Sequence, residues 1–400
     1  MGKLNIFRSF GLLIALSVFG LMLVDAAKRN LSAQLNPGCP DSICESIFED
    51  EKITVVHVQA EGDNDTLHYI WDLSRQPTVL VALCERNTNV TIGYNGTVKD
   101  ADSIQFSNKP KYTMSFVLTK VFIFNDIKDQ ASIIGVNTSN IETIDTKYLT
   151  WTRENFTEST GEVKVAVSGK NDSLIGCDGV INLKLKCYGE EDHDSDIPHL
   201  IHSINVTQVD IEFINLTSNK TFESPRIAAE FVLVASESPK NPFNITKRKT
   251  VDDEHTPGTF TLVDIITPGE TQGSYMQYRP ISYTEDSRDI TAKTDVQVNE
   301  PVFIADAKSY LNSSLAYSYY GNTLDKNLVQ SFNISFGQTQ DKFYSLTNYT
   351  TWTFVLGYGT APPERVSMFI AILACIGLGI PLLLLIIGGI YLAVKRMRNC

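Results

Sequence analysis

The residues best suited to acid–base chemistry lie in DDEHTP, residues 252–257. Asp252, Asp253 and Glu254 supply three adjacent carboxylates, and His255 follows them directly. Glycosidases use two such carboxylates across the bond that they cleave. Such a cluster is more often a turn of solvated charges before a strand than a catalytic site. The sequence also offers no second pair of carboxylates that could act together with this one. We therefore predict no catalytic residues, and a hydrolase built on this cluster is the alternative.

A second polar group lies in YGEEDHDSDIPH, residues 188–199, where Asp192, Asp194 and Asp196 alternate as at the start of an EF-hand loop. That loop needs Gly at its sixth place and Glu at its twelfth, and this chain has Ile197 and Ser203 there. Three neighbouring histidines are possible metal ligands: His193, His199 and His202. A solvated acidic linker explains the segment more simply. We predict no metal and no cofactor, and the P-loop, dinucleotide, zinc-helix and hydrolase-elbow motifs are absent from the sequence.

The segment TLHYIWD, residues 66–72, places aromatic side chains on one face of a strand and His68, Ile70 and Asp72 on the other. An exposed aromatic face binds sugars, whereas a buried one packs a core. We favour the core strand.

Segments that alternate between apolar and polar residues must position these groups. Examples are ITVVHVQA, TVLVALCE, TMSFVLTKVFIF, EVKVAVSG, VINLKLKC, AEFVLVAS, TFTLVDII, LAYSYYG and TWTFVLGYG. Such alternation, rich in β-branched and aromatic residues, predicts half-buried strands. The resulting all-β region is longer than one core usually serves. We expect two β-sandwich domains, residues 27–190 and 200–363, joined by an acidic linker at 191–199.

Both ends of the chain carry membrane signals. Residues 1–26 have the basic start, apolar centre and small-residue end of a secretory signal peptide. Residues 366–394 contain no charge and are long enough to span a bilayer as a helix. Basic residues then begin at Lys395, which predicts a cytosolic tail at 395–400. Within the span, small residues recur every fourth position and are helix-packing candidates: Ala371, Cys375 and Gly379.

Acceptor sequences for N-glycosylation lie only between the signal and the span. Their asparagines are Asn30, Asn64, Asn89, Asn95, Asn137, Asn155, Asn171, Asn205, Asn215, Asn219, Asn244, Asn312, Asn333 and Asn348. This number exceeds what chance gives, so most sites are expected to be used. The sequence predicts a type I glycoprotein with a lumenal ectodomain.

Five cysteines lie in this oxidising compartment, so they cannot all pair within one chain. Cys39 and Cys44 close a short loop, and Cys177 and Cys187 flank a Gly-containing stretch with a hairpin pattern. We take these four as disulfide candidates and Cys84 as the unpaired thiol. Spacing alone does not determine the connectivity.

The formal net charge is -12 at pH 7. Because a phosphate backbone attracts a basic surface, this charge argues against a nucleic-acid partner. An acidic surface also loses repulsion as carboxylates protonate, which suits an acidic lumen.

Six blocks in series give the sequence a specific likeness: TLHYIW, DSIQFS, VDDEHTPGTF, QYRPISY, SFNISFG and WTFVLGYG. Followed by a C-terminal span, they resemble the glycosylated lysosomal membrane protein family from about residue 50 to the membrane. The resemblance implies a lysosomal, non-enzymatic type I protein. It also implies an accessory subunit that pairs with a lysosomal small-peptide transporter of the major facilitator superfamily, stabilising it and protecting it from lumenal proteases. A cell-surface adhesion or binding glycoprotein is a further alternative.

Overall fold

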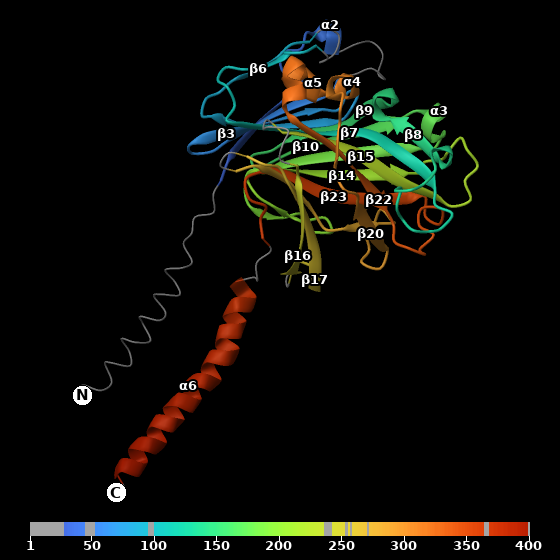
Figure 1. Ribbon diagram of the computed structural model, residues 1–400. Helices are drawn as coiled ribbons and strands as arrows, with labels where there is room; N and C mark the ends of the chain where they lie inside the picture. The colour runs from blue at the N-terminus through green and yellow to red at the C-terminus, as the bar shows by residue number, and fades with distance from the viewer. Residues whose placement is uncertain are drawn as a thin grey trace.

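Most of the alternating segments form strands of two antiparallel sheets that pack face to face (Figure 1). The protein is represented by a computed structural model that describes residues 28–44, 53–94, 100–235, 242–252, 255–256, 258–269, 272–363 and 368–398. The predicted signal peptide at 1–26 lies outside these residues. The all-β ectodomain with a C-terminal helix is confirmed.

The first sheet is built around the long strand β7. Its strands, in spatial order, are β1 (Asn30–Leu35), β2 (Val55–Glu61), β3 (Asp65–Asp72), β4 (Thr78–Glu85), β7 (Tyr112–Asn125), β15 (Pro225–Ala235) and β22 (Leu328–Phe336). Beyond β4, β7 also pairs with β8 (Ile141–Asp145), and β22 pairs with β21 (Val302–Phe303).

The second sheet runs in the order β9 (Thr150–Glu158), β10 (Glu162–Lys170), β11 (Val180–Tyr188), β14 (Val206–Ile214), β23 (Tyr349–Tyr358), β18 (Ser274–Tyr278), β17 (Gly258–Ile266) and β16 (Asn244–Asp252). The short strand β19 (Ile281–Tyr283) also pairs with β23. β20 (Lys293–Val298) pairs first with β19 and then with β22, so it passes from one sheet to the other.

Apolar side chains from both sheets fill one interior. Phe231 of the first sheet lies 5.9 Å from Trp352 of the second, between ring centroids, and Phe116 lies 5.2 Å from Phe354. Trp71 is also fully buried in this core. Aromatic pairs at these distances are favourable beyond the area that they bury.

The prediction of two β-domains is wrong for the described residues. β7 pairs with β15 along eleven residues, and β11 pairs with β14, so strands from both predicted halves lie in the same sheets. Both halves of the chain contribute buried side chains to one shared core. The alternation of apolar and polar residues identifies buried strand faces, but it does not identify which strands share a core. The predicted linker at 191–199 instead contains β12 (Asp192–His193), which forms a hairpin with β13 (Ile201–His202).

Short helices cover the outer face of the first sheet. The segment LAYSYYG, predicted as a strand, forms the helix α5 (Leu315–Tyr320), which the Ser314 hydroxyl caps by accepting a bond from the Tyr317 amide. With α4 (Ala307–Leu311) and the 3-10 helix η4 (Gly321–Lys326), it packs on Val117 and Val232 and lies above β7 and β15 in Figure 1. The segment forms a helix rather than a strand because its apolar residues pack into two clusters on the outer face of the sheet: Ala316 and Tyr320 in one, and Leu315 in the other.

Six further short elements complete the described ectodomain. They are α2 (Asp41–Cys44), β5 (Val90–Ile92), β6 (Ile104–Phe106), η2 (Thr138–Asn140), η3 (Thr146–Tyr148) and α3 (Asp172–Ile175). Two of them, β5 and β6, form a hairpin that packs against Ile70 and Leu80 of the first sheet.

The C-terminal helix α6 spans Met368–Arg398 and contains Pro381. At about 1.5 Å per residue its 31 residues are about 46 Å long, more than a hydrocarbon core needs. Within the described chain it is the one helix long and apolar enough to cross a membrane, over Cys375–Arg398. The helix continues through Lys395, past the predicted end of the span at residue 394.

Candidate functional site

Asp252, the first residue of the carboxylate cluster, ends β16, and His255 and Thr256 lie between it and β17. Asp252 is buried, and its Oδ2 lies 3.0 Å from Nη2 of the buried Arg279. The same carboxylate accepts the backbone amides of His255 at 3.0 Å and Thr256 at 2.9 Å. A carboxylate that accepts two backbone amides of the residues that follow it acts as a turn cap. Asp253 and Glu254 lie outside the described residues.

Histidines from the β12–β13 segment meet this turn. The His193 ring stacks on the His255 ring with centroids 3.8 Å apart, and His199 lies 6.2 Å from His255. A cleft of about 320 Å³ opens beside them, lined by His199, His255, Phe260, Arg279, Tyr283 and Lys293 among others. Among the described residues, no three His, Cys, Asp or Glu side chains converge to hold a metal.

The acidic segment is more buried than a solvated linker would be. Asp194 is 5% exposed, and its carboxylate lies 3.0 Å from Nζ of Lys186, which also contacts Asp196 at 3.0 Å. Burial acts to raise the pKa of Asp194, but Lys186 and Gln208 outweigh it and lower that pKa. The aspartates fix the hairpin to β11, and sequence reasoning missed this because Lys186 sits in an alternating strand.

The strand TLHYIWD belongs to the core, as predicted. Tyr69 and Trp71 are fully buried in the main interior, and Ile70 faces a second apolar cluster on the other side of the sheet. His68 is buried on that side against Phe106, with ring centroids 5.8 Å apart. A sugar-binding face is excluded for this strand.

The predicted glycosylation sites lie at the surface. Ten asparagines are exposed: Asn30, Asn64, Asn89, Asn137, Asn155, Asn215, Asn219, Asn244, Asn312 and Asn348. Three are half-buried: Asn171, Asn205 and Asn333. Asn95 lies outside the described residues. No described acceptor is fully buried, and occupancy of the sites stays a prediction.

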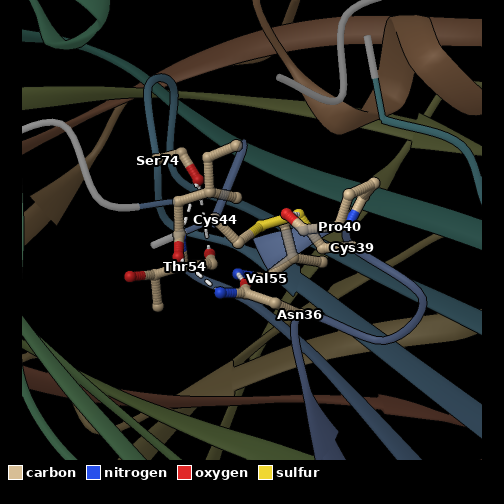
Figure 2. The surroundings of a disulfide bond; sticks show 8 residues. Asn36, Cys39, Pro40, Cys44, Thr54, Val55 and Ser74 are labelled. Carbon is tan, nitrogen blue, oxygen red and sulfur yellow. Dashed lines mark hydrogen bonds between the residues drawn. A yellow bond between two sulfur atoms is a disulfide. The ribbon is translucent and has the colours of Figure 1, made fainter. Parts of the chain in front are cut away.

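A disulfide joins Cys39 and Cys44, whose Cα atoms are 6.1 Å apart (Figure 2). The loop that it closes is fixed to the first sheet by Asn36, whose side chain accepts the Val55 amide and donates to the Ile53 carbonyl, each at 2.8 Å. The predicted pairing within this loop is confirmed.

The predicted pair Cys177–Cys187 is absent, and both thiols are free, as is the buried Cys84. β11 is extended from Val180, so Val180 and Cys187 are about 23 Å apart along the strand. The three steps from Cys177 to Val180 cover about 11 Å at most, so the Cα atoms of Cys177 and Cys187 remain about 12 Å or more apart. A disulfide needs Cα atoms within about 7 Å, so the two cysteines cannot pair. Cys187 instead points into the core and donates its thiol to the Val206 carbonyl at 3.5 Å.

This arrangement predicts a graded thiol reactivity. Alkylation of the native protein should modify Cys177 rapidly, whereas Cys84 and Cys187 should react only after denaturation because burial raises the pKa of each thiol to about 12. Mass spectrometry of peptides alkylated before and after denaturation measures this order. Recovery of a Cys177–Cys187 disulfide peptide would contradict the structure.

The segment that leads to the membrane helix is attached to the sandwich. The Pro362 carbonyl accepts Nη2 of Arg248 at 3.0 Å and Nε2 of Gln277 at 3.3 Å. Asp264 accepts Nε of Arg248 at 2.9 Å and the Gln277 amide at 2.8 Å. We call these four residues the stalk clamp. Sequence analysis missed it, since nothing in the spacing of these residues relates them.

Two of the helix-packing candidates, Cys375 and Gly379, lie on one face of α6, since residues four apart share a face. Cys375 is exposed, and a side chain at Gly379 would meet nothing within 4 Å. Ala371 lies on the same helix. This stripe is open to another helix, and its role in packing stays a prediction.

Comparison with known proteins gives a consistent result across the chain. The sequence profile of the family described as glycosylated lysosomal membrane protein matches residues 54–399. Glycosylated lysosomal membrane protein B of Xenopus laevis is 26% identical over 391 residues, covering 92% of this chain and 91% of that protein. The Danio rerio protein of the same description is 24% identical over 94% of this chain and 91% of its own length, and the Homo sapiens protein is 23% identical over 86% and 84%.

Proposed function

The chain belongs to the glycosylated lysosomal membrane protein family, and we propose that it is an accessory subunit of a lysosomal transporter. It is a lysosomal membrane glycoprotein that crosses the membrane once, through α6. The proposed partner is a small-peptide transporter of the major facilitator superfamily, as the resemblance of the sequence blocks implies. The heterodimer would form by lumenal contacts and by packing of α6 against the transporter.

The observation that carries this proposal is a sandwich with predicted glycans on its surface and a clamp that keeps it near the membrane. Glycans at exposed sites such as Asn137, Asn215 and Asn348 would surround the ectodomain with bulky polar chains. A glycan-coated domain beside a transporter limits the access of proteases to its lumenal loops. A partner that binds only the folded transporter also stabilises it by mass action.

The hydrolase alternative loses support from the geometry of its own cluster. Asp252 is engaged by Arg279 and by two backbone amides, so it is poorly placed to exchange protons with a substrate. Known relatives carry no enzymatic name. The adhesion alternative is tested by surface labelling of intact cells.

Loss of this protein should lower the abundance of its transporter several-fold, with the messenger RNA unchanged, because the uncovered transporter is degraded. Quantitative mass spectrometry of purified lysosomes, with and without an inhibitor of lysosomal proteases, measures the effect. Restoration by the inhibitor would support protection. Unchanged transporter abundance would remove the accessory role.

Co-purification tests the helix contact with a matched pair of variants. Gly379→Leu should reduce recovery of the transporter, because it fills the small-residue stripe. Gly377→Leu makes the same change about 200° around the helix and should leave recovery unchanged. Equal recovery from both variants would show that this stripe does not contact the partner.

A further inference from the structure

The stalk clamp limits how far the ectodomain can lie from the bilayer. Five residues separate Pro362 from Met368, the first residue of α6. Even fully extended, the six steps between their Cα atoms span about 22 Å. Figure 1 shows α6 leaving the sandwich at the end where the β16–β17 hairpin projects. The clamp therefore keeps this end of the second sheet within about 22 Å of the start of α6, on the side of the sandwich that faces the membrane.

A cleft of about 490 Å³ lies beside the clamp. Its lining includes Arg248, Ile266, Gln272, Tyr275, Ala361 and Pro363. A volume of this size is typical of sites that hold a small molecule. The β16–β17 hairpin forms one wall and the stalk forms the other, so the cleft is adjacent to the chain that enters the membrane.

The two kinds of side chain in this cleft suit the two halves of one ligand. Arg248 uses Nε for Asp264 and Nη2 for Pro362, while its side chain remains 33% exposed. A guanidinium recognises phosphate oxygens with strong, directed hydrogen bonds. Ile266, which is 38% exposed, and Pro363 add apolar surface to the same cleft. An amphipathic phosphodiester would use both parts.

We propose that this cleft binds the headgroup of a glycerophospholipid from the lumenal leaflet. The phosphodiester would contact Arg248, and the glycerol with the first methylenes of the acyl chains would contact Ile266 and Pro363. The occupant is a lipid because the clamp keeps the cleft near the bilayer. The bound lipid would fix the orientation of the ectodomain on the membrane surface.

The test uses full-length protein in detergent and short-chain phospholipids below their micelle concentration. Dihexanoylphosphatidylglycerol and dihexanoylphosphatidylcholine share the phosphodiester, so each should slow amide hydrogen exchange in peptides covering β17 and β18. At a lipid concentration of twice the Kd, the slowing is about threefold if exchange requires the empty state. Inorganic phosphate lacks the apolar part and should give no protection at the same concentration.

Variants separate the cleft from general charge and from misfolding. Arg248→Gln and Ile266→Glu should each abolish protection, and Ile266→Glu leaves every clamp residue in place. Lys249→Gln is the matched control, since Lys249 is exposed on the opposite face of β16 and should retain protection. Asn244 lies opposite Ile266 across the strand pair, so the assay is run before and after enzymatic removal of N-glycans.

Protection in either glycan state supports the proposal. Three results would overturn it: no protection by either phospholipid, equal protection by inorganic phosphate, and loss of protection in Lys249→Gln. Protection that appears only when another membrane protein co-purifies would assign the cleft to a protein contact instead. Since the assay needs no transporter, its failure is distinct from failure of the proposed accessory function.

Discussion

Replacing Arg226 with methionine is expected to lower the free energy of unfolding by about 3–5 kcal/mol at pH 7, because it removes the cation from a buried ionic network. The Arg226 side chain is 2% exposed, and its nitrogens contact Asp126 and Asp341 at 2.9 Å each and also Asp129. Methionine fills similar space but leaves these carboxylates facing one another. Denaturant unfolding followed by tryptophan fluorescence measures the loss, since Trp71, Trp151 and Trp352 are all buried.

The matched control is Arg86→Met, because Arg86 pairs with Glu61 at 2.8 Å while its side chain is 55% exposed. An exposed pair contributes little, so this variant should change stability by less than about 1 kcal/mol. Equal losses from both variants would show that the Arg226 network is not special.

Acid should reduce the defect of the Arg226 variant. Burial acts to raise the pKa of Asp341, but amides of Gln338 and Phe343, the Thr294 hydroxyl and Arg226 outweigh it, so the pKa is lowered. The stabilisation from this group is present above the ordinary pKa of an aspartate and is lost as pH falls through the lowered value. Wild-type and variant stabilities should therefore converge in strong acid.

Strand positions were largely predictable because the order of apolar and polar residues within each strand reflects which of its faces is buried. VINLKLKC alternates because one face of β11 enters the core, and β11 occupies that segment. The pairing of β7 with β15 was not predictable, since it joins residues a hundred or more positions apart. The same limit explains the two-domain error, because alternation identifies a buried face without identifying what covers it.

The candidate sites divide in the same way. Cys39 and Cys44 form a disulfide across a short loop, so their spacing was informative. Cys177 and Cys187 are also near each other in sequence, but most of the extended strand β11 lies between them. The stalk clamp depends on Arg248, Gln277 and Pro362, which meet only after three strands have assembled. No local pattern marks such a contact.

The buried pair His57 and His68 should make the ectodomain less stable in acid. Nε2 of His57 lies 3.0 Å from Nδ1 of His68, and both rings are buried. Burial lowers the pKa of His57 to about 4. Burial, reinforced by His57, lowers the pKa of His68 to about 3. Since an unfolded histidine has a pKa of about 6.5, the unfolded chain binds these protons more readily.

The sign of the effect follows from this difference. A lowered folded pKa gives stability that is complete above about pH 6.5 and declines as pH falls toward the folded value. Between pH 7 and pH 5 each histidine is expected to remove about 2 kcal/mol, or about 4 kcal/mol for the pair. The double variant His57→Gln with His68→Gln should lose this pH dependence, and each single variant should lose about half.

Asp72 provides a control of opposite sign. Burial raises its pKa to about 6, so its contribution is complete below the ordinary aspartate pKa and is lost as pH rises through about 6. Asp72→Asn should therefore make the decline from pH 7 to pH 5 steeper by about 1 kcal/mol. Unfolding measured at both pH values distinguishes the variants, and the same pH dependence in all of them would show that neither site titrates on folding.

The histidine pair thus destabilises this ectodomain in an acidic lumen, and it opposes the contribution of Asp72 and the loss of repulsion between surface carboxylates. A partner present at about a thousand times its Kd contributes about 4 kcal/mol to the folded state, which matches the loss expected from the histidine pair. Protection in the proposed heterodimer would then act in both directions, because the transporter would stabilise the ectodomain that shields it. The pH dependence of unfolding should accordingly be measured with and without the co-purified partner, and partner binding should raise stability at pH 5.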